Sequence, residues 1–273
     1  MAMQTLTAAA IQMVSGDDLA ANLERAEALL ADAAAQGAQF VALPEYFYLM
    51  PADERARLAL AEPFGAGPLQ QRLAAAAAHH GVWLLAGTLP LAGTQPGRFC
   101  NSSLLFNPQG QCAARYDKTH LFGFDDGRER YAEADTMQAG DSVVSAATPW
   151  GPTRLSVCYD LRFPELYRQA PAPVLITAPA AFTHTTGLAH WELLLRARAV
   201  ENLAFVVAPG QGGVHPGGKR TFGHSMIVDP WGQVLACHAE GEGEGIALAT
   251  LDFTGQQTWR SRLPALQHRR FIG

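Results

Sequence analysis

Short apolar stretches of strand type alternate with stretches of helical periodicity, and this alternation limits the folds that the chain can adopt. Residues 5–13 predict a buried strand, and apolar residues then recur at helical spacing until Gly37 ends the helix. The other expected strands are residues 40–43, 82–88, 154–158, 174–179 and 205–208, and the other expected helices are residues 69–80 and 190–202. Repeated strand–helix–strand units of this kind indicate an α/β protein.

Each half of the chain also contains one expected hairpin. Residues 102–106 and 111–116 flank the turn 107–110, and residues 224–228 and 233–237 flank the turn 229–232. Both turns place proline and glycine at favourable positions. Because no linker or low-complexity stretch separates the halves, we expect residues 1–273 to form a single domain of two sheets with helices outside.

Composition excludes several classes of protein. Hydrophobic residues make up 48% of the chain and charged residues 16%, as in globular proteins with a large core. A formal net charge of -5 offers no basic surface for phosphates, so we expect no nucleic-acid partner. The N-terminus lacks the pattern of a signal peptide, and no stretch reaches 18 apolar residues. We therefore expect a cytoplasmic protein without a membrane segment.

Cysteine and lysine usage narrows the chemistry. The chain has four widely spaced cysteines, Cys100, Cys112, Cys158 and Cys237. Neither zinc-type pairing nor the density of a disulfide framework is present, so we expect reduced thiols and no metal or other cofactor. Of the 20 basic residues only two are lysines, Lys118 and Lys219. Lysine carries a compact point charge whereas arginine carries a planar, forked one. A site that needs a single ammonium close to a reacting atom cannot accept arginine, which is a possible reason for each lysine.

Three reactive groups lie where expected strands end. Glu45 follows residues 40–43, Lys118 follows the hairpin strand 111–116, and Cys158 ends the strand that begins at residue 154. Ligand sites of α/β proteins lie beyond the carboxyl ends of strands. The residues after Cys158 predict a sharp turn into a helix that exposes the sulfur. Two plainer explanations stay open, namely a buried structural thiol at Cys158 and a structural salt bridge between Glu45 and Lys118.

Three motifs occur in order along the chain: Leu43-Pro44-Glu45, residues 116–122 around Lys118, and residues 158–165 after Cys158. With these motifs the chain resembles the nitrilase superfamily of carbon–nitrogen hydrolases over essentially its whole length. The resemblance implies a four-layer α-β-β-α sandwich of two mixed sheets with outer helices. It also implies a homodimer or higher homo-oligomer that pairs through helices near the Cys158 strand and through the C-terminal tail.

Within the superfamily the chain looks most like the Nit branch, whose members are amidases acting on ω-amides of small acids and on deaminated glutathione. The stretches that carry this similarity are residues 189–192, 196–199, 223–226, 229–232 and 263–270. Tyr159-Asp160 differs from the residues that follow the cysteine in true nitrilases and in carbamoyl hydrolases. Relatives usually carry proline where this chain has Leu188. An N-carbamoyl hydrolase or a nitrilase is the alternative within the superfamily.

The chemistry of amide hydrolysis gives the motif residues roles. We expect Cys158 to attack the amide carbon, and we expect Glu45 to take the thiol proton, pass it to the departing nitrogen and then activate water. Lys118 and the backbone amide of Tyr159 are expected to stabilise the oxyanion. The family pattern places its second glutamate at Glu133, which would orient Lys118 and the substrate amide. We expect the ammonium to lower the thiol pKa and burial to raise a carboxylate pKa.

The expected substrate is a small amide that bears a carboxylate, and its cleavage releases ammonia or an amine. Arg162 lies one helical turn past the nucleophile, where its guanidinium can bind a carboxylate with two parallel hydrogen bonds. An ion pair of Arg162 with Glu165 or Asp160 is an equal alternative. Three further residues are expected to line the pocket from the loop before the 190–202 helix: Phe182, Thr183 and Thr186.

Three hypotheses from other classes also stay open. The nine histidines allow a cysteine–histidine hydrolase, although none has a diagnostic spacing to Cys158. Residues 213–219 nearly match a phosphate-binding loop of a nucleotide-binding protein. Arg220, however, replaces the hydroxyl residue that binds magnesium, and Pro216 interrupts the loop, which favours a surface or pocket-rim loop. A non-catalytic scaffold is the third, because a large apolar core alone does not show activity.

Overall fold

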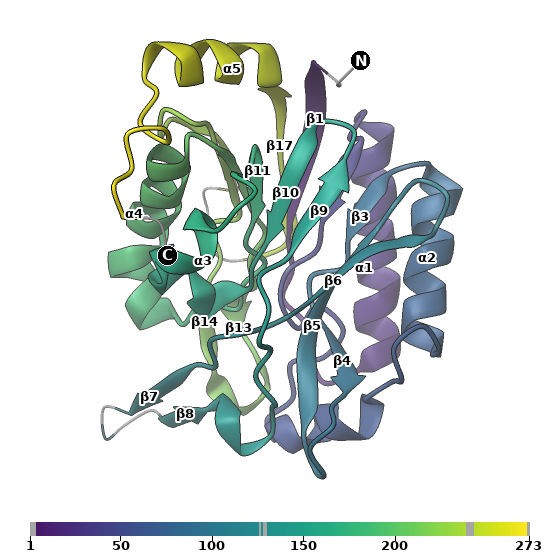
Figure 1. Ribbon diagram of the computed structural model, residues 1–273. Helices are drawn as coiled ribbons and strands as arrows, with labels where there is room; N and C mark the ends of the chain where they lie inside the picture. The colour runs from purple at the N-terminus through teal and green to yellow at the C-terminus, as the bar shows by residue number, and fades with distance from the viewer. Residues whose placement is uncertain (1–3, 126, 128–129, 239–242, 272–273) are drawn as a thin grey trace.

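Two mixed β-sheets lie face to face in the centre of the computed structural model, and helices cover their outer faces (Figure 1). The structure describes residues 4–125, 127, 130–238 and 243–271. The predicted α/β class and the four-layer α-β-β-α sandwich are confirmed. Among these residues, no helix has the length and apolar character needed to cross a membrane.

The first sheet has seven strands, and its central strands β1, β2 and β3 are parallel. β17 and β5 pair antiparallel at either side, and β6 pairs with β5 in the predicted hairpin. The bounds are β17 Gly245–Asp252, β1 Thr5–Gln12, β2 Phe40–Ala42, β3 Trp83–Leu85, β5 Phe99–Phe106, β4 Leu89–Ala92 and β6 Cys112–Asp117.

The second sheet has six strands and repeats this plan, with a parallel centre and antiparallel edges. β15 and β16 form the second predicted hairpin. The bounds are β16 Val234–Cys237, β15 Met226–Val228, β12 Phe205–Ala208, β11 Leu175–Thr177, β10 Gly151–Leu155 and β9 Ser145–Thr148.

Helices α1 (Leu19–Ala35) and α2 (Pro68–His80) cover the first sheet, and α3 (Pro164–Arg168) and α4 (His184–Asn202) cover the second (Figure 1). α1 begins where the Asp18 carboxylate accepts hydrogen bonds from the amides of Ala20 and Ala21. The remaining elements are η1 Glu54–Leu60, β7 Gly123–Asp125, β8 Arg130–Ala132, η2 Glu133–Asp135, η3 Cys158–Arg162, β13 Gly212–Val214, η4 Pro216–Gly218, β14 Arg220–Phe222 and α5 Phe253–Arg262.

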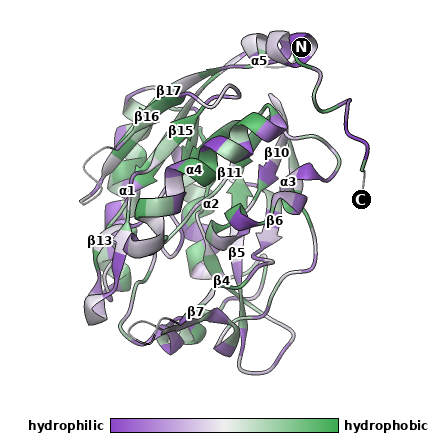
Figure 2. Cartoon of the chain, turned by 90° about the vertical axis from the view of Figure 1, so that its left-hand side faces the viewer, coloured by the Kyte–Doolittle hydropathy of each residue, from purple (hydrophilic) through white to green (hydrophobic). Residues whose placement is uncertain are grey.

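The core has two parts, because successive residues of a strand face opposite sides of its sheet. On β1, Ala8 and Ala10 pack against the second sheet, whereas Ala9 and Ile11 pack under the first pair of helices. Figure 2 shows apolar strands in the interior and polar residues mainly on the outer helix and loop surfaces. The strands are therefore held on both faces, which fixes where their ends lie.

Two details differ from the sequence-based expectations. β10 ends at Leu155, so Cys158 lies three residues beyond the strand, at the start of η3. α4 begins at His184 rather than at residue 190, which places Thr186 on the helix and not on a loop. The sequence did not indicate that the helix begins at His184, because the polar and small residues of its first turns show no apolar periodicity.

The segment that resembles a phosphate-binding loop has a different structure. β13 and β14 pair antiparallel around η4, whereas a phosphate-binding loop joins a strand to a helix. The nucleotide-binding hypothesis is therefore wrong, because this segment lacks the strand-to-helix connection that the hypothesis requires. The hairpin agrees with the interpretation of the segment as a surface or pocket-rim loop.

Gly87 permits a close approach that positions the end of β2. Its φ is +44°, and an added Cβ would collide with the carbonyl oxygen of Pro44, directly before Glu45. Gly37 also has a positive φ, but nothing lies within 4 Å of an added Cβ there. An alanine at Gly37 would therefore add backbone strain alone, whereas an alanine at Gly87 would add both strain and a steric collision.

We predict that Gly87→Ala destabilises the protein by about 3 kcal/mol or more, because strain and collision add. Gly37→Ala, the matched control, should cost only about 1–2 kcal/mol of strain. Urea denaturation measures both free energies of unfolding. Equal losses for the two variants would show that Gly87 does not hold the β2 end in place.

Candidate active site

A buried ammonium joins two carboxylates at the centre of the site. Lys118 Nζ lies 2.9 Å from Glu45 Oε1 and 2.8 Å from Glu133 Oε1. The Lys118 side chain is fully buried, and both carboxylates are nearly so. Buried charges are tolerated only when they are paired and hydrogen-bonded, so each of the three depends on the others.

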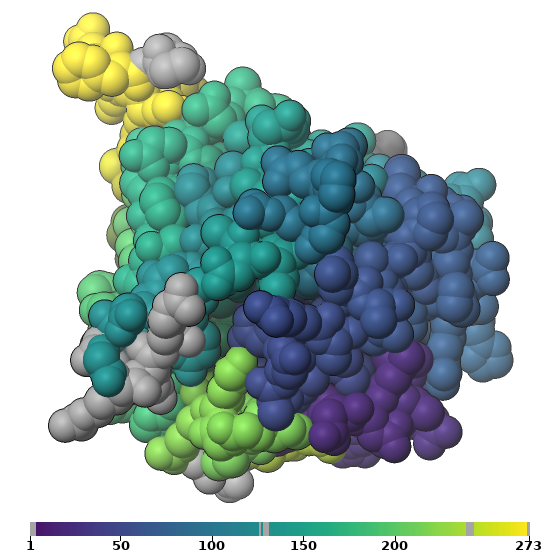
Figure 3. Space-filling model, turned by 90° about the horizontal axis from the view of Figure 1, so that it is seen from below, coloured from purple at the N-terminus to yellow at the C-terminus, as the bar shows by residue number. Residues whose placement is uncertain are grey.

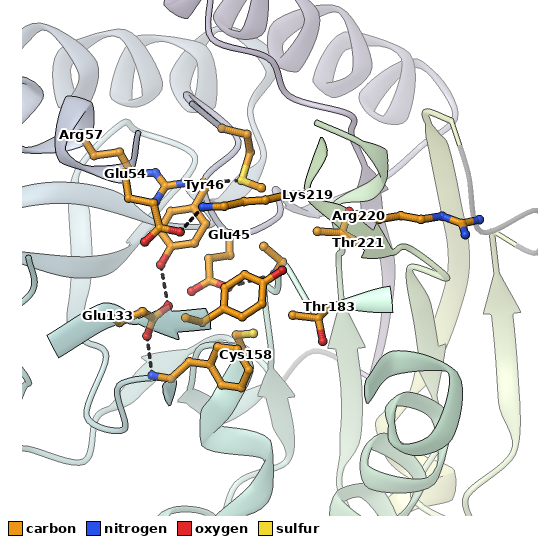
Figure 4. A pocket seen from close by; sticks show the side chains of 14 residues that line it. Glu45, Tyr46, Glu54, Arg57, Glu133, Cys158, Thr183, Lys219, Arg220 and Thr221 are labelled. Atoms are coloured by element: carbon orange, nitrogen blue, oxygen red, sulfur yellow. Dashed lines mark hydrogen bonds and ion pairs between the residues drawn. The ribbon is translucent and has the colours of Figure 1, made fainter. Parts of the chain in front are cut away.

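Each of these groups comes from a different connection in the chain. Glu45 follows β2, Lys118 directly follows β6, Glu133 begins η2, and Cys158 begins η3. The structure brings together all four predicted catalytic residues. Glu45, Glu133 and Cys158 line one cavity (Figure 4), and Lys118 bonds both glutamates. The parallel strands of both sheets direct these connections to the same end of the sandwich.

Further hydrogen bonds fix the two carboxylates. Glu45 Oε1 accepts from Asn101 Nδ2 at 2.9 Å, and Glu45 Oε2 accepts from the Ala181 amide at 2.9 Å. Glu133 accepts from the Tyr46 hydroxyl at 2.7 Å and from the Phe122 amide at 2.7 Å. Each glutamate is therefore held in one orientation before any ligand enters the cavity.

The backbone at Cys158 makes the predicted sharp turn. Its φ is +49°, a left-handed conformation that is uncommon for a residue with a side chain. The Cys158 amide donates to the Pro179 carbonyl oxygen at 3.0 Å, which anchors the turn to the segment just after β11. The side chain is 8% exposed. Strain of this kind is maintained by the surrounding structure and is concentrated at functional sites.

Asp160 links the Cys158 turn to the segment that carries Lys118. Its carboxylate accepts from the Val157 amide and the Tyr116 hydroxyl, both at 2.8 Å. It also accepts from the His120 amide at 3.2 Å and lies 2.7 Å from His120 Nδ1. Tyr116 and His120 flank Lys118 in the chain, so one buried carboxylate fixes the lysine segment relative to the cysteine.

Burial and charge shift the pKa values of the central groups. Burial raises the pKa of Glu45, and Lys118 opposes this rise. Burial lowers the pKa of Lys118, but Glu133 and Glu45 outweigh it, so the lysine pKa lies above its ordinary value. Lys118 therefore stays charged, and the pKa of Glu45 lies above its ordinary value, as suits a group that accepts and returns a proton.

Lys118 lowers the pKa of the Cys158 thiol, as expected, but the net shift of this pKa is upward. Burial raises the pKa of this thiol most, Glu45 raises it further, and Lys118 opposes the rise only in part. The expectation did not include the effect of burial on the thiol. Cys158 is a neutral thiol at rest, so it needs a base when it attacks. Glu45 is close enough to affect this thiol by charge and hydrogen bonding.

Cys158 lies between two adjoining cavities, which share Phe122, Cys158, Ala181 and Thr183. We call the first the glutamate cavity, because Glu45 and Glu133 line it. Its outer wall contains Glu54, Arg57 and Lys219, among other residues. Figure 3 views this face from below, where the dark blue segment around η1 adjoins the light green β13–β14 hairpin. The second, which we call the arginine cavity, is lined by Tyr159, Arg162, Phe182 and Thr186 together with the shared residues.

All five predicted substrate-binding residues line the arginine cavity, although their role there stays a prediction: Tyr159, Arg162, Phe182, Thr183 and Thr186. Within the described part of the chain, Arg162 forms no ion pair with Glu165 or Asp160. Both of its terminal nitrogens lie 3.3 Å from His190 Nδ1 instead. Leu188, where relatives usually have proline, is 72% exposed on α4 and lines neither cavity.

Several site residues were missed by sequence reasoning. They are Tyr46, Asn101 and Ala181, which bond the glutamates, and Glu54, Arg57, Tyr131 and Thr221, which line the glutamate cavity. Tyr46 follows Glu45 directly, and hairpin pairing places Asn101 beside Lys118, so these two had a local signal. The other residues come from segments with no distinctive pattern. No histidine lines either cavity among the described residues, which argues against the cysteine–histidine hypothesis.

Comparisons with known proteins agree with this geometry. The chain matches the carbon–nitrogen hydrolase family over residues 7–261. A deaminated glutathione amidase from Yersinia enterocolitica is 40% identical over 275 residues, which cover 99% of this chain and 95% of that protein. The crystal structure of Nit3 from Saccharomyces cerevisiae, a member of branch 10 of the nitrilase superfamily, is 30% identical with a TM-score of 0.87 and covers 99% of this chain and 98% of that one.

A mutant amidase from Nesterenkonia sp. AN1 is a further structural relative, 25% identical with a TM-score of 0.78 over 97% of this chain and 94% of that one. It carries the acetamide moiety of fluoroacetamide added covalently at its active-site cysteine. The predicted resemblance to the nitrilase superfamily and its Nit branch is thus confirmed. The chain belongs to the carbon–nitrogen hydrolase family and is a hydrolase of carbon–nitrogen bonds.

Proposed function

We propose that the protein is a cysteine-dependent amidase for small carboxylate-bearing amides, such as deaminated glutathione or the ω-amide of a 2-oxo acid. The observation that carries this proposal is the buried Lys118, bonded to both Glu45 and Glu133, beside a strained cysteine. The deaminated glutathione amidase from Yersinia enterocolitica supports the substrate class. Arg162 in the arginine cavity supplies a cation for a substrate carboxylate.

The first half-reaction transfers the acyl group to the enzyme. Glu45 takes the thiol proton as Cys158 Sγ bonds to the amide carbon, and the carbonyl oxygen becomes an oxyanion. Lys118 and the Tyr159 amide stabilise that oxyanion. As it collapses, the carbon–nitrogen bond breaks, Glu45 returns the proton to nitrogen, and ammonia or an amine leaves a thioester on Cys158.

The second half-reaction restores the enzyme. Glu45 takes a proton from water, whose oxygen bonds to the thioester carbon, and the carbon–sulfur bond then breaks. The proton passes from Glu45 to the departing sulfur, and the product is a carboxylic acid. Glu133 positions Lys118 through both half-reactions without exchanging a proton. The rise in the Glu45 pKa caused by burial suits it to both transfers.

Replacing the nucleophile tests this function. We expect Cys158→Ala to abolish release of ammonia or amine over a panel of small amides, nitriles and carbamoyl compounds, because no thioester can form. Cys237→Ala, a change at a cysteine outside both cavities, is the matched control and should retain turnover. Activity in Cys158→Ala would refute the thioester mechanism, and turnover of nitriles or carbamoyl compounds alone would refute the amidase assignment.

Titration of the thiol tests the resting state. We expect the thiolate absorbance that Cys158→Ala removes to appear only above pH 9.0, the ordinary cysteine value, because burial and Glu45 raise this pKa. The measurement is the ultraviolet difference spectrum of the two proteins against pH. A Cys158 thiolate that forms below pH 9.0 would mean that the cysteine rests as an ion pair with Lys118.

We also propose that residues 1–273 form one domain and that two copies pair through α4 and the C-terminal tail. Hydrogen bonds such as Gln211 Nε2 to the Glu45 carbonyl oxygen, 3.1 Å, connect the two sheets and support one domain. Leu193 and Val200 on α4 are 66% and 48% exposed, as expected of an uncovered interface.

We also propose that the protein is located in the cytoplasm. All four cysteines are unpaired, which supports this reducing compartment as the location.

Light scattering at micromolar concentration checks the pairing. We expect the mass of a homodimer or a larger oligomer, and we expect Leu193→Glu to shift it toward the monomer because a charge would be buried at the interface. Val214, which is also exposed but lies on the β13–β14 hairpin, provides the control as Val214→Glu. A monomeric unchanged protein would contradict the proposal.

A further inference from the structure

Asn101 is a buried side chain that contacts Glu45 but lines neither the glutamate cavity nor the arginine cavity. It lies on β5, is 0% exposed, and its backbone carbonyl oxygen accepts from the Lys118 amide at 3.0 Å. Its Nδ2 donates to Glu45 Oε1 at 2.9 Å, whereas its Oδ1 has no hydrogen-bond partner in the part of the chain that the structure describes. An unsatisfied buried oxygen costs stability, and an apolar side chain would avoid that cost. Packing alone therefore does not explain an asparagine here.

The two oxygens of Glu45 differ in how many donors they already have. Each carboxylate oxygen has about two lone-pair positions that accept hydrogen bonds. Oε1 accepts from Lys118 Nζ and from Asn101 Nδ2, both at 2.9 Å, so both of its positions are filled. Oε2 accepts from the Ala181 amide at 2.9 Å, and among the described residues no other nitrogen donates to it. One position on Oε2 is therefore left for a proton.

The open position on Oε2 lies on the side of the nucleophile. Ala181, whose amide bonds Oε2, lines both cavities together with Cys158. Burial raises the pKa of the Cys158 thiol most, whereas hydrogen bonding to the Ala181 amide lowers this pKa. The same backbone amide is thus close to both the thiol and Oε2. Oε2 is therefore the oxygen that can exchange a proton with Cys158.

Asn101 has two effects on this carboxylate. It fills the second position on Oε1, so a proton cannot bind there without displacing a hydrogen bond. It also stabilises the ionised form of Glu45, because a donor to a carboxylate favours the charged state. An apolar side chain in its place would leave Oε1 with Lys118 alone. A proton on Oε1 would then lie beside the Lys118 ammonium rather than beside the Ala181 amide.

We infer that Asn101 is a positioning residue that directs the catalytic proton to Oε2 of Glu45. The inference rests on the proton transfers of the proposed function and specifies the oxygen that carries them out. As Cys158 Sγ bonds to the amide carbon, its S–H bond breaks and the proton binds Oε2. As the carbon–nitrogen bond breaks, the same proton leaves Oε2 for the departing nitrogen. Lys118 and Asn101 keep their hydrogen bonds to Oε1 through both steps.

An apolar replacement of Asn101 leaves the charges around Glu45 in place. Burial raises the Glu45 pKa, Lys118 lowers it, and Glu133 raises it. The titratable groups that interact with Glu45 from the neighbouring segments are Lys118, Glu133, Cys158, Tyr46 and Tyr48. None of them changes when the uncharged Asn101 is replaced by a leucine of similar size. A changed pH dependence of Glu45 in this variant therefore reports the lost hydrogen bond.

Labelling of Cys158 with methyl methanethiosulfonate at varied pH tests the inference without an amide. The new disulfide bond forms, methanesulfinate leaves, and the thiol proton passes to Glu45, so the rate falls at acid pH where Glu45 is already protonated. Mass spectrometry of a digest measures Cys158 apart from the other cysteines. We expect Asn101→Leu to move this fall toward higher pH, because the ionised Glu45 loses a donor. The plateau rate above the fall should drop about tenfold, as for loss of a hydrogen bond to a charged group.

A matched control comes from the same face of β5. Ser103 lies two residues after Asn101, is 0% exposed, and its hydroxyl has no hydrogen-bond partner among the described residues. Ser103→Ala should therefore change neither the pH of the fall nor the plateau rate. Thermal melting shows which variants fold. Asn101→Val, which also lacks the donor and suits a strand, replaces Asn101→Leu if the latter does not fold.

The two effects together distinguish positioning from other roles of Asn101. A stronger base alone would raise the plateau rate, because proton acceptance improves with the pKa of the base. A lower plateau without a shift of the fall indicates a purely structural role and overturns the inference. A shift with an unchanged or higher plateau overturns it too, because Asn101 would then alter the pKa of Glu45 without selecting its oxygen. Two unchanged features have the same consequence.

Ammonia release from the ω-amide of 2-oxoglutaric acid, measured over the same pH range, separates this inference from the proposed function. A shift of kcat/KM in Asn101→Leu that parallels the labelling supports both. Amide turnover by the unchanged protein, with labelling that the Asn101 variants do not alter, overturns the inference alone. Labelling that responds as expected, with no turnover of any small amide, overturns the amidase function and leaves the assignment of Asn101 intact.

Discussion

Lys118 places a positive charge where almost no solvent reaches it, and Glu45 and Glu133 make that position tolerable. An unpaired buried charge costs several kcal/mol, so removing any one of the three leaves the others poorly satisfied. The three residues follow β2, follow β6 and begin η2, so the ion pairs form only when a central strand and an outer strand of the first sheet are both in place. The geometry needed for chemistry is therefore also a condition of folding.

The strand ends were predictable from sequence to within about three residues, because apolar runs and turn residues mark them. Glu45, Lys118 and Cys158 were placed near strand ends in this way, although only Lys118 follows its strand directly, and both hairpins were found from their proline and glycine turns. The face on which Lys118 lies was not predictable. The β5–β6 pairing shifts by one residue between Leu105 and Phe106, and a shift of one residue turns every later side chain to the other face.

Electrostatics was the other part that the sequence did not reveal. The thiol pKa of Cys158 depends on the surrounding charges and on the burial of the thiol. Neither can be inferred from a local sequence motif. Asp160 shows the same limit. It follows the cysteine by two residues, yet its partners Tyr116 and His120 come from the segment around Lys118. A tertiary contact of this kind has no periodic signal along the chain.

The scarcity of lysine acquires a physical explanation in this structure. Arginine serves at the peripheral ion pairs, such as Arg72 with Glu27, where a planar fork matches a carboxylate. Both lysines of the chain belong to the glutamate cavity, because Lys219 lines it and Lys118 bonds the two glutamates that line it. At Lys118 a single compact ammonium contacts two carboxylates at once, and in the proposed mechanism its third hydrogen serves the substrate oxygen. A guanidinium spreads its charge over a plane and would, in that mechanism, occupy the space that the substrate carbonyl needs.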